Sequence, residues 1–362
     1  MDTTTDGPDA FTEYRGTRSR ECPKRMVFGP CGGVRDDATC EMDAHICPFA
    51  VLTEPIRWPQ PLTSPASSSE LINASRTRPV VLSDLSVPAF DRGVLEQVAS
   101  ILGESSDAVL VGEHQNRPDY PPTVMAQIIR GVGGCPWVTL TCRDRNRVVL
   151  EQELMGLGQA GADGVFCVTG DGRAQGVRQD VTQVFDLDGT RLAALAAQAD
   201  LAVGVPEAPE AVPTSIRPAR LLEKQRAGAQ LAVLNHVSTP ESLRAFMSAA
   251  RAQGVTMPVI AGVAVYTDER SAQVLAAFPG LHLDHSQITR VLAADDSVEA
   301  GIETAVDEAV ALLDIPGVVG VNLSGLASAA GEVPAAKVKA EIGRRLRERL
   351  ADGAQSVKAA QW

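Results

Sequence analysis

Two short segments of the chain end in side chains of the kind that bind ligands and transfer protons. The apolar run at residues 138–141 leads into Thr141-Cys142-Arg143-Asp144, and the run at 165–168 leads into Thr169-Gly170-Asp171. A carboxylate can donate or accept a proton, while hydroxyl and guanidinium groups fix the orientation of a bound molecule. These two segments are therefore the first candidates for a functional site.

The elements around these segments place both of them on one rim of a parallel sheet. Between the segments, Val149, Leu150, Leu154 and Leu157 recur at helical spacing, so the unit is predicted to run strand, helix, strand. Strands joined by such a crossover are parallel. In parallel α/β folds, ligands bind just past the carboxyl ends of the strands, where both polar segments lie.

The same alternation continues along the chain and predicts the fold. Strands are expected at residues 80–86, 108–111, 137–141, 164–169, 201–205, 231–235, 258–263 and 318–323. Helical patterns fall between them, as at 94–102, 241–253 and 299–313, and a last helix is expected at 336–350. Eight strand–helix units without hairpin signals favour a (β/α)8 TIM barrel. A doubly wound open sheet is the alternative, but no Gly-x-Gly-x-x-Gly turn follows the first strand.

In a barrel, the residues that follow the strands meet at one mouth. The predicted strand ends bring mainly carboxylates and amides there: Asp84, Glu113, His114, Asp144, Asp171, Glu207, Asn235 and His236. This set contains no Ser–His–Asp triad and no isolated lysine that could form a Schiff base.

The segment Leu140-Thr141-Cys142-Arg143-Asp144, followed one strand later by Thr169-Gly170-Asp171, resembles the methylenetetrahydrofolate reductase family. A Thr-Gly-Asp tripeptide alone is more often a strand-ending turn, but the pair at this spacing is specific. The resemblance implies a TIM barrel that reduces 5,10-methylenetetrahydrofolate to 5-methyltetrahydrofolate with NADH or NADPH and FAD. In that family the Asp of the turn lies beside the flavin and the folate.

The resemblance also implies roles for individual residues. Asp84 matches a family Glu that protonates the folate, and it is shorter by one methylene group. Asn235 matches a Gln that binds substrate, and Lys224 matches a Lys near the cofactor phosphates. The expected site is catalytic Asp84 and Asp171, substrate-binding Asp171 and Asn235, and cofactor-binding Thr141, Arg143, Thr169, Gly170 and Lys224.

Three departures from the family pattern leave the use of flavin open. Thr139, Val205 and Arg217 stand where the family often has His, Tyr and Asp. The protein could be a reductase with bound FAD, or a reductase that passes hydride directly from NADH. The third hypothesis is a non-reducing folate-binding or electron-transfer subunit of a one-carbon or methyltransferase complex.

The N-terminal part of the chain carries four cysteines in a short segment. Residues 1–20 are polar and are expected to be disordered, and 21–57 contain Cys22, Cys31, Cys40 and Cys47. Four thiolates suit zinc or an iron–sulfur cluster, although the gaps of eight, eight and six residues are wider than in ordinary zinc fingers. The alternative is four reduced cysteines in a loop-rich cap.

The segment around Gly29-Pro30-Cys31-Gly32-Gly33 is similar to a cysteine-rich companion domain of some bacterial methylenetetrahydrofolate reductases. This resemblance implies a metal centre without choosing between zinc and iron–sulfur. A Pro- and Ser-rich linker is expected at 58–77, followed by the barrel at 78–352.

Composition excludes several classes of protein. The 362 residues include 45 acidic against 33 basic residues, a net charge of −12, and aromatic residues make up 4%. This balance argues against a nucleic-acid partner. No apolar run has the length of a membrane span, and the acidic N-terminus does not resemble a signal peptide, so a cytoplasmic protein is expected. A folate is the expected substrate; a redox or methyltransferase protein partner and a homo-oligomer remain open.

Overall fold

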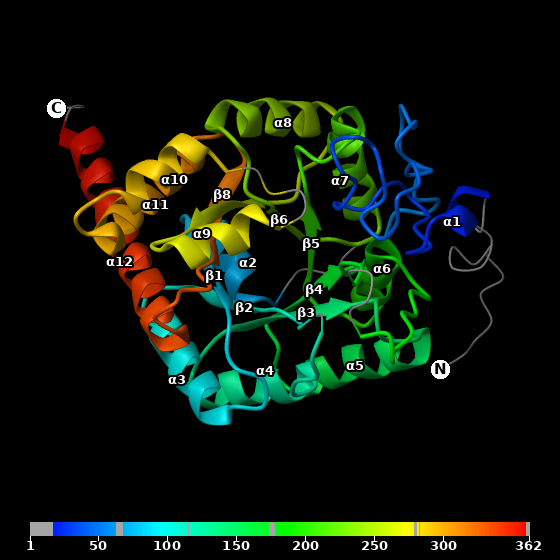
Figure 1. The fold of residues 1–362 in the computed structure, drawn as a ribbon, viewed down its shortest axis with the longest axis horizontal. Helices are drawn as coiled ribbons and strands as arrows, with labels where there is room; N and C mark the ends of the chain where they lie inside the picture. Colours follow the sequence, from blue (N-terminus) through cyan, green and yellow to red (C-terminus); the bar gives the residue numbers. More distant parts are fainter. Residues whose placement is uncertain are drawn as a thin grey trace.

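The computed structural model describes residues 17–62, 68–114, 116–173, 178–278, 281 and 283–359, and the side chains of these residues between 18 and 352. Eight parallel strands pair in sequence order, and the last pairs with the first, so the sheet closes into a barrel (Figure 1). This confirms the predicted (β/α)8 barrel and excludes the open sheet. The strands are β1 Val80–Leu85, β2 Ala108–Val111, β3 Pro136–Thr141, β4 Gly164–Val168, β5 Val203–Glu207, β6 Leu231–Leu234, β7 Val259–Val265 and β8 Val318–Gly325.

The helices surround the barrel, as the amphipathic patterns predicted. The larger ones are α3 Arg92–Gly103, α4 Pro122–Gly131, α5 Arg147–Gln159, α6 Gly189–Gln198, α7 Arg217–Arg226, α8 Pro240–Ala252, α11 Ser297–Leu313 and α12 Glu332–Ala359. Shorter elements are α1 Thr17–Glu21, α2 Glu70–Ser75, η1 Thr214–Ile216, α9 Glu269–Ala276 and α10 His285–Leu292. In α5, Leu150, Leu154 and Leu157 are buried, whereas Val149 is 37% exposed. Most of the predicted apolar stripe therefore faces the strands.

The barrel interior is filled by large apolar side chains from alternate strand positions. Trp137 and Phe166 pack there with Leu82, Leu110 and Ile260. A polar layer at the carboxyl ends of the strands lies above this core, and it forms the mouth.

Helix α2 closes the opposite end of the barrel, inside the segment that was predicted to be a linker. Leu71 and Ile72 pack with the interior residues near the amino ends of the strands. The carboxylate of Asp163 accepts hydrogen bonds from the Ser69 hydroxyl at 2.7 Å and from the Trp137 indole at 2.7 Å. The backbone N–H of Glu70 also donates to the Asp163 carboxylate. Helix α2 is therefore anchored by a buried carboxylate that is fully hydrogen-bonded.

The cysteine-rich N-terminal module, residues 21–57, lies against α6 and α7 and has little regular structure (Figure 1). Phe28 and Trp58 pack with Ala194 and Ala227 of the barrel helices. The backbone N–H of Val27 donates to Asp188, the residue that also caps α6, at 2.8 Å. Residues 17–20, the end of the tail that was expected to be disordered, belong to α1, and the remainder of that tail, 1–16, lies outside the described residues.

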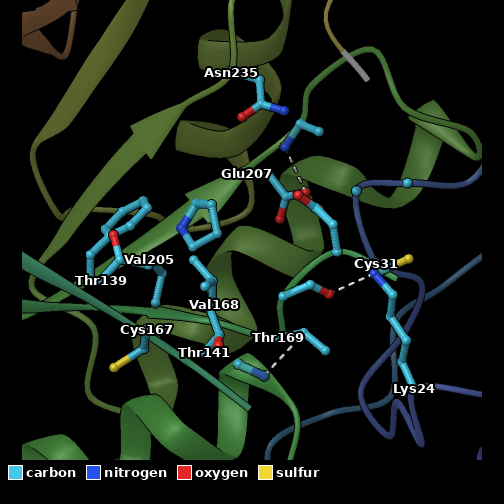
Figure 2. Close-up of a pocket in the computed structure, with 18 of the residues that line it drawn as sticks. Lys24, Cys31, Thr139, Thr141, Cys167, Val168, Thr169, Val205, Glu207 and Asn235 are labelled. Atoms are coloured by element: carbon cyan, nitrogen blue, oxygen red, sulfur yellow. Dashed lines mark hydrogen bonds between the residues drawn. The ribbon is translucent and has the colours of Figure 1, made fainter. Parts of the chain in front are cut away.

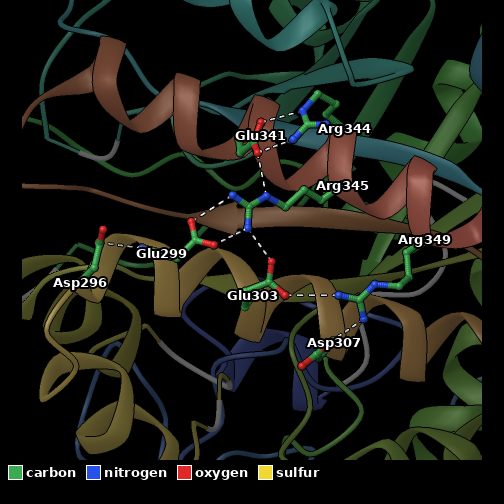
Figure 3. Close-up of polar contacts among 8 residues, drawn as sticks. All are labelled: Asp296, Glu299, Glu303, Asp307, Glu341, Arg344, Arg345 and Arg349. Atoms are coloured by element: carbon green, nitrogen blue, oxygen red, sulfur yellow. Dashed lines mark hydrogen bonds and ion pairs between the residues drawn. The ribbon is translucent and has the colours of Figure 1, made fainter.

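A network of charges at the surface, some of them partly buried, joins α12 to α11 (Figure 3). Arg345 of α12 pairs with Glu299 and Glu303 of α11 and with Glu341 of its own helix. Arg349 extends the network to Asp307 at 3.0 Å. Single exposed pairs contribute little, but a connected set fixes the register of the two helices. Among the described helices, none has both the length and the apolar composition required to cross a membrane.

Candidate active site

A cavity of about 350 Å³ lies at the barrel mouth, between the ends of β3 to β6 and the N-terminal module (Figure 2). Seven of the residues expected from the sequence line it: Thr141, Arg143, Thr169, Gly170, Asp171, Lys224 and Asn235. The module contributes Lys24, Cys31 and Glu41 to the same wall. The candidate site therefore lies at the junction of the two parts of the chain.

The Thr169-Gly170-Asp171 turn packs tightly against the end of β3. Gly170 has a φ of +93°, and a Cβ atom there would lie 3.1 Å from Cβ of Arg143 and 3.2 Å from Cβ of Thr141. Glycine is therefore needed both for the backbone conformation and for the close approach. The Thr169 hydroxyl accepts a hydrogen bond from the N–H of Gly189 at 2.9 Å, which ties the turn to the start of α6.

The N-terminal module holds this turn from the other side. The Lys24 ammonium donates to the Gly170 carbonyl oxygen at 2.7 Å and pairs with Glu41 (Figure 2). The Thr169 hydroxyl lies 3.5 Å from the sulfur of Met26, and a Cβ at Gly172 would overlap Met42. Burial alone would lower the pKa of Lys24, but Cys31, Glu41 and Asp171 raise it overall, so Lys24 is a buried cation.

Arg143 and Thr141 organise the mouth through contacts within the protein. The Arg143 guanidinium is 2% exposed and donates to Asp144 at 2.9 Å and to the carbonyl oxygens of His114 and Asp171 at 3.1 and 3.5 Å. The Thr141 hydroxyl donates to Glu113 at 2.8 Å, which also pairs with Arg145. In this structure Arg143 supports the backbone of the Asp171 turn.

Glu207, at the end of β5, is a buried carboxylate among three cations. Lys224 lies 2.8 Å and Arg217 lies 3.4 Å from its oxygens. Burial would raise the pKa of Glu207, but Lys224, Arg217 and Arg220 lower it to about 2. Burial lowers the pKa of Lys224 to about 8, although Glu207 opposes this shift. Lys224, predicted as a cofactor ligand, therefore already has a protein partner.

Arg220 is a cation that the sequence analysis missed. It lines the cavity and is 4% exposed, and its Nε is buried without a hydrogen-bond partner. Arg217, Arg220 and Lys224 lie three and four residues apart, on one face of α7, and this spacing was the available signal. Three cations against the single carboxylate of Glu207 leave two positive charges in this cluster. A buried guanidinium N–H without an acceptor is costly, so the cluster suits an anionic ligand.

Asp84 does not line the same cavity as Asp171. It borders a neighbouring cavity on the β1 and β8 side of the mouth, and its Oδ1 accepts a hydrogen bond from Asn322 at 2.9 Å. Asn235 lies on the wall of the first cavity (Figure 2), which Asp171 also lines. The two predicted acids therefore lie in different cavities of the barrel mouth.

The four N-terminal cysteines lie near one another. Cys22 and Cys47 are buried in one apolar cluster, and Cys31 packs against its edge. Burial raises the pKa of Cys22, and Cys47 and Cys40 add to this shift. Cys31 also faces the cavity, where its thiol donates to Glu41 at 3.3 Å. Among the described residues, one group of three metal-binding side chains has its ligand atoms within 4.8 Å of one another: Glu70, Cys135 and Asp163. The four N-terminal cysteines do not form such a group in this structure. The predicted four-cysteine metal site stays a prediction.

The fold and the site together define a (β/α)8-barrel protein with a polar, ligand-sized mouth that is partly covered by an N-terminal module. A family model for methylenetetrahydrofolate reductase matches residues 119–329, more than half of the chain, and the protein belongs to this family. The match includes the Thr141–Asp144 segment and the Thr169–Asp171 turn. Both motifs therefore fall within the region that defines membership.

The solved structures that match this chain are distant in sequence. An uncharacterised protein from Clostridium thermocellum, described as binding two copies of 5-methyl-5,6,7,8-tetrahydrofolic acid, is 14% identical with a TM-score of 0.54, and the match covers 74% of this chain and 95% of that chain. Tryptophan synthase from M. tuberculosis is 15% identical with a TM-score of 0.45, over 77% of this chain and 99% of that chain. No curated protein matches the sequence.

Proposed function

We propose that the protein reduces 5,10-methylenetetrahydrofolate to 5-methyltetrahydrofolate with hydride from NADH or NADPH. The observation that carries this proposal is the position of Asp171, on the family's Thr-Gly-Asp turn, in the wall of a cavity at the barrel mouth. The structural neighbour described as binding 5-methyltetrahydrofolate supports a folate as the ligand.

The chemistry requires a proton and a hydride. The bond between the methylene bridge and one of its nitrogens breaks, the proton goes to that nitrogen, and the bridge becomes an iminium cation. Hydride from the nicotinamide then adds to the carbon, which leaves a methyl group and NAD(P)⁺. We assign Asp84 to the proton transfer and Asp171 to stabilisation of the cation, while the Asn235 amide binds the folate.

The residues of this cavity fit the phosphates of a dinucleotide, a part that FAD and NAD(P)H share. Arg220 has a buried donor without a partner, and Lys224 lies one helical turn away on the same face of α7. Arg220 would hold the phosphates, and Lys224, which is paired with Glu207, would add positive charge beside them. Bound FAD would supply a carrier for hydride between nicotinamide and folate. Thr139 and Val205 stand where the family often has His and Tyr, so an imidazole and a phenol are missing from these two positions.

An assay of the purified full-length protein tests this proposal. Oxidation of NADH and of NADPH is followed with methylenetetrahydrofolate, with and without added FAD, and 5-methyltetrahydrofolate is identified by mass spectrometry. A visible flavin spectrum in the purified protein would indicate that hydride passes through bound FAD. Turnover without flavin would indicate direct hydride transfer from the nicotinamide. Absence of 5-methyltetrahydrofolate with every donor, reduced flavin included, contradicts the proposal.

A second function is favoured by the position of the cysteine-rich module. Cys31 and Lys24 of the module form part of the cavity wall, so a protein partner that docks on the module would lie next to the bound folate. Under this alternative the protein is a non-reducing folate-binding subunit of a methyltransferase or electron-transfer complex. Folate binding without reduction by any donor, together with co-purification of a redox or methyltransferase protein, would establish it.

A further inference from the structure

A second cavity, of about 360 Å³, opens on the same face of the barrel, beside the candidate active site. Its walls come from the loops after β1 and β8, from α3 and from the first turns of α12. In many barrels, the loops after the last strands and the start of a helix bind a phosphate group. The charges in this cavity decide whether such a ligand fits here.

The innermost charged group of this cavity is Lys339 of α12. It is 3% exposed, and its ammonium donates to the backbone carbonyl oxygen of Asp84 at 2.8 Å. Within the described part of the chain, no carboxylate lies within ion-pair distance of this nitrogen. An ammonium has three N–H donors, so two remain for a ligand. Burial lowers the pKa of Lys339 to about 8, with Asp84 opposing, so the group is still mostly charged near neutral pH.

Two further cations border the cavity at its outer edge. Arg117 and Arg270 are exposed, and neither forms an ion pair with another described residue. The carboxylates on the wall are Asp84, which is bound to Asn322, and Glu332. Three cations against two carboxylates leave one positive charge.

The other residues that line the cavity add no negative charge, and many of them are small, which leaves space for a ligand. Burial and Arg117 lower the pKa of His114, which keeps this residue neutral near pH 7. The amino end of α12, a helix of 28 residues, contributes the positive end of its dipole. Small residues make up much of the wall: Gly325, Ala327, Gly331, Ala335 and Ala336.

We propose that this cavity binds an oxyanion, the phosphate or carboxylate group of a small ligand, with Lys339 as its buried contact and Arg117 and Arg270 as its outer contacts. The volume lies at the lower end of the range of about 300–1,000 Å³ found for small-molecule sites, so it accommodates a small anion or the charged end of a longer molecule. The proposal rests on the cavity and its charges and does not require the reductase activity, although Asp84, the proposed proton donor, forms part of the wall.

The experiment is a calorimetric titration of the full-length protein at low ionic strength. Two probes are titrated. Inorganic phosphate represents the phosphate group of a nucleotide, and glutarate represents the glutamyl tail of a folate. We expect at least one probe to bind, and Lys339→Gln and Arg270→Gln each to weaken it about tenfold, as expected for loss of a charge-assisted hydrogen bond. The probe that binds more tightly shows whether the natural ligand presents a phosphate or a carboxylate to the cavity. Lys337→Gln, at an exposed position on the same helix, is the matched control and should bind like the wild type.

Two results would overturn the site: no heat of binding with either probe, or equal affinity in the wild type and all variants, which indicates attraction to the surface only. Lys339 is buried, so its substitution could impair folding. Arg270 is exposed and its variant is expected to fold, so unchanged binding in folded Arg270→Gln and Arg117→Gln would by itself contradict the proposed outer contacts and with them the site. The assay does not use reduction of a folate, and its result is separate from the test of the proposed function.

Discussion

At the scale of single residues, Asp171 is the strongest candidate for a direct contact with the folate. A carboxylate at a water-poor barrel mouth stabilises a developing cation, and removal of one such group costs on the order of 10²–10³ in rate. We expect Asp171→Asn to lower kcat for reduction of methylenetetrahydrofolate by about this factor. Asp295→Asn, at an exposed position after α10, is the control. Near wild-type turnover by Asp171→Asn would remove this residue from the site.

The second acid, Asp84, has a different neighbourhood and a separate test. Asp84→Asn keeps an oxygen that can accept the hydrogen bond from Asn322 but has no proton to transfer, so turnover should be lost while folate binding survives. Asp84→Glu lengthens the side chain by one methylene group. If the shorter acid is an adaptation, Glu should lower the rate, because catalytic placement matters at the scale of an ångström. An unchanged rate in Asp84→Asn would show that the proton comes from another group.

At the scale of elements, the N-terminal module acts on the Thr169-Gly170-Asp171 turn through Lys24. Lys24→Met keeps the length of the side chain but removes the hydrogen bond to the Gly170 carbonyl oxygen and the pair with Glu41. We expect a fall in kcat of about tenfold with a smaller change in KM, since the turn loses a support rather than a ligand contact. Hydrogen exchange of residues 168–173 should become faster.

Arg25→Met is the matched control for Lys24, because Arg25 is the next residue and its side chain is 56% exposed. Its variant should leave both the kinetics and the exchange of the turn unchanged. If Lys24→Met also left both unchanged, the module would cover the mouth without positioning the catalytic turn.

The cysteines of the module belong to the same scale, because a metal would order a segment too small to form a core of its own. We expect anaerobically purified protein to contain about one zinc or iron–sulfur site per chain, bound by Cys22, Cys31, Cys40 and Cys47. Cys22→Ser should lower metal content and destabilise residues 21–57. Cys31→Ser tests separately whether the thiol that faces Glu41 is the fourth ligand. Elemental analysis that finds neither zinc nor iron would leave these residues as reduced cysteines in a cap.

At the scale of the whole molecule, the barrel could be predicted because each strand is a short apolar run and each helix carries an apolar face. The sequence predicted the fifth strand at 201–205, two residues before the observed β5 at Val203–Glu207, and this shift has a local cause. Asp200 adopts a φ of +58° and the N–H of Leu201 bonds back to Ala196 of α6, so this strand begins at Val203. Helix α2 was missed because prolines and serines surround its two core residues.

Apart from Lys224, which lies in α7 and was named from the family resemblance, the predicted residues that line the cavity are those that follow strands. The Lys24–Gly170 contact joins residues 146 positions apart and comes from docking of the module, which no local pattern encodes. Arg220 has the spacing of a helical face but no motif that marks it. The separation of Asp84 from Asp171 depends on how the loops divide the mouth into two cavities, and that division is a property of the packed structure.

The charge cluster at Glu207 links the site to the stability of the whole chain. Glu207 has a pKa of about 2 in the folded protein against an ordinary value of 4.5, so it stabilises the fold above pH 4.5 and this contribution is lost as pH falls from about 4.5 to about 2. Glu207→Gln leaves the buried cations of Lys224 and Arg217 without their partner. We expect a loss of about 3–5 kcal/mol in the free energy of unfolding near pH 7, the range for breaking a buried pair. Because the variant lacks the titrating group, the gap between it and the wild type should narrow as pH falls through that window.

Glu341 provides a matched comparison for this last prediction. Its pKa is also lowered to about 2, by hydrogen bonds from Arg344 and Arg345, but it is a partly exposed member of the network between α11 and α12 (Figure 3). Water and salt screen such pairs, so Glu341→Gln should change the free energy of unfolding only slightly, and less still in high salt. Urea unfolding of the two variants and the wild type across pH measures both effects. Equal, small losses in both variants would mean that the cluster of Glu207 with Arg217, Arg220 and Lys224 is open to water, and the argument for an anion at Arg220 would lose its basis.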